Sequence, residues 1–259
     1  MVRIAAVVAW FVSASLPAWA GCFPIAQGPA SLHLAAYTPE PLPEDATLRL
    51  SFLGHASFLI ESQGGVSAVT DYNAVHRAPF APTIVTMNNA HRTHWTDRIE
   101  PGVEEVLRGW DPAGGLAEHD VTIDDMRVRN VVTSVRGREG WGANSNSIFV
   151  FEVDDLCVAH LGHLHHPLED YHLAELGIID VLLVPVDGMW TMPHRTAVEV
   201  IEQIRPAVVV PMHYFGRHVL DAFLAQMDPA WGVRWLEEPV WSLSRASLPF
   251  RQIVVMPGS

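Results

Sequence analysis

The stretch Leu156–His166, LCVAHLGHLHH, is an apolar run of strand type that opens directly into a histidine-rich loop. Residues 83–94 (TIVTMNNAHRTH) and residues 207–214 (AVVVPMHY) repeat this arrangement elsewhere in the chain. Rigid strand ends can bring distant side chains to one point, and imidazole nitrogen is a preferred ligand of Zn²⁺ and related divalent metals. For any one of these histidines a place on the surface or in the core is the better interpretation, but three such clusters together favour a metal site.

The remaining segments predict short strands that alternate with helices, which is an α/β pattern. Residues 48–61 (LRLSFLGHASFLIE) alternate apolar and polar positions, and a Gly64-Gly65 turn then predicts a hairpin with residues 66–71. We expect further strands over residues 121–134, 147–153 and 181–186, and helices over residues 170–176 and 197–204. Because no repeat of fixed period and no long linker interrupts this pattern, a single domain is expected.

The composition and the net charge of the chain indicate which kinds of molecule it binds. The chain has 259 residues, of which 49% are hydrophobic, so a sizeable core is expected. Its formal net charge of −13 argues against a basic surface for nucleic acid or for an anionic membrane. We expect a small-molecule substrate, with an anionic compound as one option. The oligomeric state is left open.

The N-terminus has the pattern of an export signal. Residues 1–20 contain one early positive charge and an apolar run, and they end on a small-x-small cleavage pattern, Ala18-Trp19-Ala20. We therefore predict a signal peptide over residues 1–20, an irregular lead-in over residues 21–46 and a folded domain over residues 47–259. The expected location is the periplasm or the exterior of the cell, with no membrane span after processing. An uncleaved anchor and a lipid-anchored form at Cys22 are the alternatives.

The two cysteines of the chain are Cys22 and Cys157. In an oxidising compartment the two could pair. Cys157 lies in the apolar run Leu156–Ala159, however, and a small buried core residue is the favoured interpretation.

The order of six short segments resembles a known family. The segments are Gly54–Glu61, Thr70-Asp71, Ala143–Glu152, Ala159–Leu168, Asp180–Met192 and Val208–Tyr214. In this order they resemble the metallo-β-lactamase-fold hydrolases, in the branch similar to L-ascorbate-6-phosphate lactonase. The resemblance implies an αββα sandwich, a layered α/β fold with metal ions bound at one edge.

The sequence departs from this family at its metal motifs. The family pattern His-x-His-x-Asp-His falls on residues 89–94, where Asn89 replaces the first histidine and Thr93 replaces the aspartate. The aspartate that bridges two metals in the family is His163 here, and no histidine stands at Val135 or Arg136, where the family has one. A two-metal centre needs an anionic bridge, so we predict one metal. A random loss would rarely install another ligand type, which makes His163 the most informative of these residues.

The expected cofactor is one divalent transition metal, with Zn²⁺ first and Fe or Mn as alternatives. The predicted ligands are His94, His163 and His213, with His91 as a fourth or auxiliary ligand. The predicted protein is an exported metal-dependent hydrolase whose metal activates water against an ester, lactone or phosphoester bond. The alternative is a non-catalytic periplasmic metal- or small-ligand-binding protein on the same fold.

Several other residues are candidates for supporting roles. The resemblance implies that Asp71 orients a ligating histidine, and an ordinary turn aspartate is the alternative. Asp187 is a candidate general base or a compensating carboxylate near the metal, with a solvated loop residue as the alternative. His55 either faces the site or is a hydrogen-bonded core histidine. Weaker candidates are His160 behind the ligands, His165 and His166 in the loop, Arg136 and Arg138 for an anionic substrate, and Trp95, Trp141 and Trp190 as pocket walls.

Overall fold

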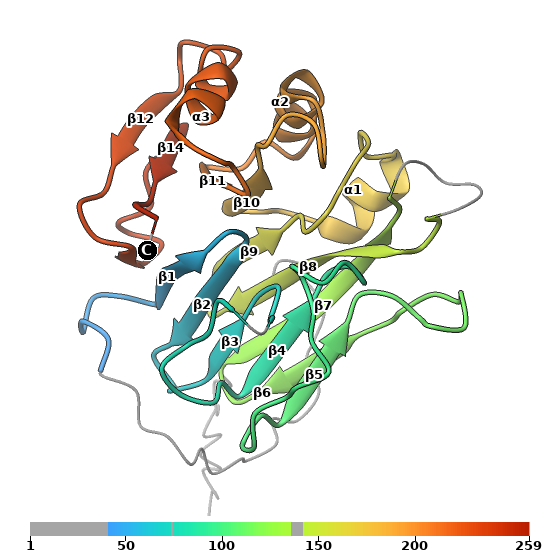
Figure 1. The fold of residues 1–259 in the computed structure, drawn as a ribbon. Helices are drawn as coiled ribbons and strands as arrows, with labels where there is room; N and C mark the ends of the chain where they lie inside the picture. Colours follow the sequence, from blue (N-terminus) through green and yellow to red (C-terminus); the bar gives the residue numbers. More distant parts are fainter. Residues whose placement is uncertain (1–40, 74, 136–141, 259) are drawn as a thin grey trace, which may run out of the picture.

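Two β-sheets form the centre of the fold in the computed structural model, which describes residues 41–73, 75–135 and 142–258 (Figure 1). The first sheet has the strand order β13-β1-β2-β3-β4-β5. Its strands are β1 (Leu48–Gly54), β2 (Ser57–Ser62), β3 (Ser67–Val69), β4 (Ile84–Met87), β5 (Glu105–Arg108) and β13 (Val240–Leu243). The signal peptide and most of the lead-in that the sequence predicts lie outside the described residues.

The second sheet has eight strands in the order β12-β14-β11-β10-β9-β8-β7-β6. They are β6 (Asp120–Ile123), β7 (Met126–Thr133), β8 (Asn146–Val153), β9 (Leu156–His160), β10 (Val181–Pro185), β11 (Val208–Met212), β12 (Gly232–Trp235) and β14 (Gln252–Val255). Strands β9, β10, β11 and β14 run parallel to one another. Strands β10 and β11 are apolar throughout and fully buried, as is typical of parallel strands covered on both faces.

The main hydrophobic core lies between the two sheets. It joins Leu50 and Phe58 of the first sheet with Phe149, Phe151 and Val210 of the second, and all five side chains are buried. At roughly 25 cal/mol for each Å² of apolar surface, burial of such large side chains is the main force that holds the sheets together.

The three helices of the described residues cover the outer face of the second sheet. They are α1 (Asp170–Leu176), α2 (His194–Ile204) and α3 (Arg217–Leu224), and they lie beside strands β9, β10, β11 and β14 in Figure 1. Their apolar residues, such as Val200 and Phe223, share a second core with Leu182 and Val209. The predicted layered α/β fold is therefore confirmed. No helix that is described here is long and apolar enough to cross a membrane.

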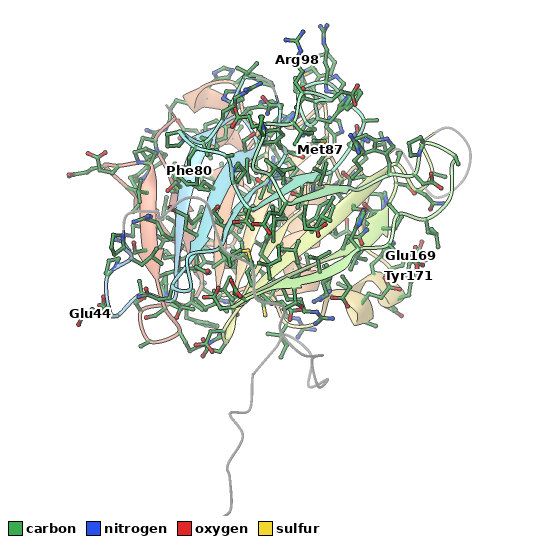
Figure 2. The ribbon with its side chains drawn as sticks, turned by 90° about the horizontal axis from the view of Figure 1, so that it is seen from below. Glu44, Phe80, Met87, Arg98, Glu169 and Tyr171 are labelled. Atoms are coloured by element: carbon green, nitrogen blue, oxygen red, sulfur yellow. The ribbon has the colours of Figure 1, made fainter. Side chains whose placement is uncertain are left out.

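Loops rather than a helix cover the outer face of the first sheet within the described ranges. Tyr72, Val85 and Met87 form a small core there, against which Phe80 and Trp95 pack. Figure 2 shows Phe80 over the strands of this sheet, whereas Tyr171, a residue of α1, lies far from it.

Two predicted strands are wrong in the same way, because each contains a turn. Residues 121–134 form strands β6 and β7, joined at Asp124 and Asp125, and Asp124 has a φ of 44°. Residues 48–61 likewise break between β1 and β2, where Gly54 has a φ of 119° and His55 a φ of 55°. Both turns use left-handed backbone conformations, which alternation of apolar and polar residues does not reveal.

Candidate metal centre

Five histidines meet at one edge of the two sheets. His55 lies in the β1–β2 turn, His91 and His94 follow β4, His163 follows β9 and His213 follows β11. Their ligand nitrogens form two sets in which all three atoms lie within 4.8 Å of one another. One set is His55, His94 and His213, and the other is His91, His94 and His163. The structure thus brings all four predicted ligands together and adds His55 to them.

The imidazole of His94 is buried and held from behind by a carboxylate. Its Nδ1 lies 2.5 Å from Oδ2 of Asp71, whose Oδ1 accepts the backbone N–H of Asn88 at 3.1 Å. Burial lowers the pKa of His94 well below its ordinary value, and the neighbouring His213 and His91 lower it further. Burial also raises the pKa of Asp71 to about 6, against the effects of His160 and of the Asn88 N–H. The carboxylate of Asp71 is thus placed to orient the imidazole of His94.

The Nε2 atom of His94 tests whether a metal fits this edge. It is buried and has no hydrogen-bond partner among the described residues, and the same is true of Nε2 of His55. A buried polar atom without a partner costs roughly 1–3 kcal/mol. Since Nδ1 of His94 is taken by Asp71, its Nε2 has a free lone pair directed at the other imidazoles. This donor set fits a borderline divalent metal.

His213 is oriented in the same way by Asp187. Its Nδ1 lies 3.1 Å from Oδ2 of Asp187, which also accepts the hydroxyl of Thr191 at 2.5 Å. Oδ1 of Asp187 accepts the backbone N–H groups of Met189, Trp190 and Thr191. Burial alone would raise the pKa of Asp187, but these hydrogen bonds together hold it below its usual range. Both carboxylate oxygens are therefore occupied, which favours a positioning role over that of general base.

His163 and His91 lie on the other side of His94. Nδ1 of His163 is 2.8 Å from Nε2 of His165, and burial, with His94 next in effect, lowers the pKa of His163 to about 2. His91 is exposed, and its Nδ1 lies 2.8 Å from the hydroxyl of Thr93. Asn89 accepts the backbone N–H of His91 at 2.9 Å. The two residues that replace family ligands thus shape the loop instead.

His160 supports the site without facing it. It is fully buried, its Nε2 donates to the backbone oxygen of Ala56 at 2.7 Å and its Nδ1 accepts the N–H of Gly162 at 3.1 Å. These bonds join strand β9 to the β1–β2 turn. Gly162 has a φ of 59°, and a Cβ there would clash with the side chain of Asn88, so glycine allows the His163 loop to pack on the residues that follow β4.

A cavity of about 1110 Å³ opens beside the histidines. Val75, Trp190 and Phe215 give it an apolar wall, and Arg92 brings a positive charge. Of the other two predicted wall residues, Trp95 packs against Trp110 and Trp141 lies outside the described residues. The predicted anion-binding residues Arg136 and Arg138 also lie outside the described residues. His165 lines the same cavity, whereas Nε2 of His166 accepts the backbone N–H of Ser134 at 3.3 Å.

Cys157 is buried on strand β9 and is disulfide-bonded. Its place in the core is as expected, whereas the disulfide corrects the preference for a core residue over a paired one. The other cysteine of the chain, Cys22, lies outside the described residues.

The sheet order, the edge position of the histidines and their order along the chain agree with one family. The beta-lactamase superfamily domain matches residues 49–213. The chain belongs to this family, the metallo-β-lactamase-fold hydrolases. The predicted superfamily is thereby confirmed, and the match spans the β1–β2 turn at one end and His213 at the other.

Proteins of similar sequence and a similar solved structure support the same family assignment. A UPF0173 protein of Pyrococcus abyssi is 42% identical over 201 residues, which cover 70% of this chain and 91% of that protein. A UPF0173 metal-dependent hydrolase of Thermococcus kodakarensis is 25% identical over 189 residues, which cover 64% of this chain and 84% of that protein. A solved structure from Thermotoga maritima is described as a candidate Zn-dependent hydrolase of the metallo-β-lactamase superfamily. It is 27% identical in sequence and has a TM-score of 0.60, and the match covers 80% of this chain and 98% of that protein.

Proposed function

We propose that this protein is a hydrolase that depends on one divalent metal ion, Zn²⁺ being the first candidate and Fe or Mn the alternatives. The observation that carries the proposal is that His94 belongs to both histidine sets and that its Nε2 atom is buried and has no hydrogen-bond partner among the described residues. An imidazole nitrogen has one lone pair in the ring plane and can bind one metal at a time. The two sets therefore exclude each other, and the site holds a single metal.

The residues behind the ligands prepare the imidazoles for binding. Asp71 accepts a hydrogen bond from the Nδ1–H group of His94, and Asp187 accepts one from the Nδ1–H group of His213. Each carboxylate fixes the tautomer and the ring orientation, so that Nε2 is the free ligand atom. A metal bound there would act as a Lewis acid and lower the pKa of a bound water, the chemistry needed to hydrolyse an ester, a lactone or a phosphoester.

The cavity beside the histidines supports a small-molecule substrate. Its volume of about 1110 Å³ slightly exceeds the range usual for small-molecule sites and leaves room for such a substrate. Arg92 at its wall can bind an anionic group, while Trp190 and Phe215 can contact an apolar part of the substrate. The disulfide at Cys157 supports export to an oxidising compartment, because structural disulfides are rare in the cytosol.

A metal- or ligand-binding protein without turnover is the second candidate. It is favoured by the absence of any carboxylate from the described residues that line the cavity. A general base would then have to be an imidazole such as that of His165. The two candidates differ in turnover, since both bind a metal.

Metal analysis combined with turnover assays separates these candidates. The purified full-length protein is assayed for metal content and then for hydrolysis of p-nitrophenyl acetate and bis(p-nitrophenyl) phosphate, with and without chelator. We expect one metal per chain and hydrolysis that chelator abolishes and Zn²⁺ restores. Tight metal binding without turnover would support the binding protein instead.

A further inference from the structure

The geometry points to His55 as a metal ligand, with His94 and His213 completing the set that holds the ion. This inference rests on the proposed function and names the residues of the same site. It adds His55, which comes from the β1–β2 turn and lies outside the metal motifs of the family, to the expected ligands His94 and His213.

The free nitrogens of the cluster favour this set. Five buried side-chain nitrogen or oxygen atoms of the described residues have no hydrogen-bond partner, and the two imidazole atoms among them are Nε2 of His55 and Nε2 of His94. Both residues, His55 and His94, belong to the His55 set. A metal between them would give each lone pair a partner and remove a cost of about 1–3 kcal/mol per atom.

The backbone holds His55 toward His213. The N–H of His213 donates to the backbone oxygen of His55 at 2.7 Å, and the two rings lie 4.1 Å apart, the shortest distance between histidine rings in the described structure. Both residues have left-handed backbones, with φ values of 55° and 54°. Such conformations are unfavourable for residues other than glycine, and strain of this kind gathers at functional sites.

Glycine at position 54 allows the turn to take this form. Gly54 has a φ of 119°, and a Cβ at this position would clash with the ring of His76. The turn therefore packs closely on His76 and directs His55 to the edge where the other imidazoles lie. His76 itself belongs to neither histidine set, and its Nδ1 lies 3.2 Å from the backbone oxygen of Leu53.

The second set is less well prepared. In the His55 set two imidazoles, His94 and His213, are backed by carboxylates. In the other set only His94 has a carboxylate behind it, because Nδ1 of His91 faces Thr93 and Nδ1 of His163 faces His165. Carboxylate partners raise the basicity of a ligating imidazole. With the metal in the His55 set, His91 and His163 are free to contact the substrate in the cavity.

Zn²⁺ affinities of four proteins test this assignment, measured by competition with a chromophoric chelator in the absence of substrate. The proteins are wild type, His55→Asn, His163→Asn and the control His76→Asn. Asparagine suits position 55 because it tolerates a left-handed backbone. We expect His55→Asn to bind Zn²⁺ at least about 100-fold more weakly, since loss of an orienting partner alone costs 10–100-fold. We expect His163→Asn and His76→Asn each to stay within about tenfold of wild type, since His163 is no ligand in this assignment and His76 only packs against the turn.

Wild-type affinity in His55→Asn together with a large loss in His163→Asn would place the metal in the other set and overturn the assignment. If wild type binds none of Zn²⁺, Fe²⁺ and Mn²⁺, the proposed function fails as well, so the two failures are distinguishable. Should His55→Asn not fold, His55→Gly keeps the backbone and leaves space for free imidazole. Recovery of the wild-type Co²⁺ absorption spectrum on adding imidazole supports the assignment, and a wild-type spectrum before imidazole is added contradicts it.

Discussion

Nδ1 of His94 lies 2.5 Å from Oδ2 of Asp71, and both side chains are fully buried although 23 positions separate them in sequence. Parallel pairing of β3 with β4 creates this contact, because Asp71 follows the first strand and the His94 loop follows the second. The pair links the sheet directly to the histidine cluster. Most of the functional predictions depend on it or on its counterpart, Asp187 and His213.

Asp71→Asn should weaken metal binding by about 10–100-fold while the fold is kept. The amide has nearly the shape of the carboxylate, but it no longer stabilises the Nδ1–H tautomer of His94. Zn²⁺ competition titrations measure the affinity, and far-UV circular dichroism checks the fold. An unchanged affinity would show that Asp71 does not act through His94.

His94→Ala should abolish metal binding at stoichiometric Zn²⁺, because His94 belongs to both histidine sets. His165→Ala is the matched control: it removes an imidazole from the same cavity but belongs to neither set. It should keep its metal with an affinity within about tenfold of wild type, since its imidazole supports His163 and is not itself a ligand in either set. Equal metal content in the two variants would contradict both assignments.

Asp187→Ala should lower the free energy of unfolding of the metal-free protein by about 2–4 kcal/mol. The substitution leaves three backbone N–H groups and the Thr191 hydroxyl without their acceptor. Urea denaturation in the presence of chelator measures this effect apart from any loss of metal. A change below about 0.5 kcal/mol would mean that water replaces the carboxylate and that the loop does not need it.

Acid should destabilise the metal-free protein through its neutral imidazoles. Burial, with neighbouring histidines adding to it, lowers the pKa of His55 from 6.5 to about 3 and that of His163 to about 2. Below pH 6.5 the unfolded chain therefore binds more protons than the folded one, so the free energy of unfolding falls as pH falls toward these values. Each such ring contributes at most about 1.4 kcal/mol per pH unit.

The contribution of one ring is the difference between wild type and His55→Asn, compared by urea denaturation between about pH 7 and pH 4. Asp71, whose raised pKa acts in the opposite direction, is present in both proteins and cancels in the comparison. We expect a shallower pH dependence in the variant. Identical slopes would show that His55 is protonated in the folded protein.

The sequence predicts the strand ends of this site well and its turns poorly. Apolar runs end before His91, His163 and His213 because buried parallel strands stop where the chain reaches the sheet edge, and those ends are found at Met87, His160 and Met212. The β1–β2 turn escapes detection because residues 48–61 keep alternating through Gly54 and His55. The role of His55 then depends on a left-handed backbone and a long-range bond to His213, neither of which leaves a local pattern.

The carboxylate partners show the same limit. The resemblance predicts that Asp71 orients a histidine, but which histidine it contacts, His94, becomes evident only when β3 and β4 pair. Asp187 is a plausible general base as long as its surroundings are unknown. Its loop folds back on the carboxylate within four residues, and this local arrangement occupies both oxygens.

Metal stoichiometry tests the central claim most directly. The full-length protein is stripped with chelator, loaded with excess Zn²⁺, freed of unbound ion and weighed intact by native mass spectrometry. We expect one Zn²⁺ per chain in wild type and none in His94→Ala. The reason is that the two histidine sets share one lone pair, that of His94 Nε2. Two Zn²⁺ per chain, or one that persists in His94→Ala, would contradict the account.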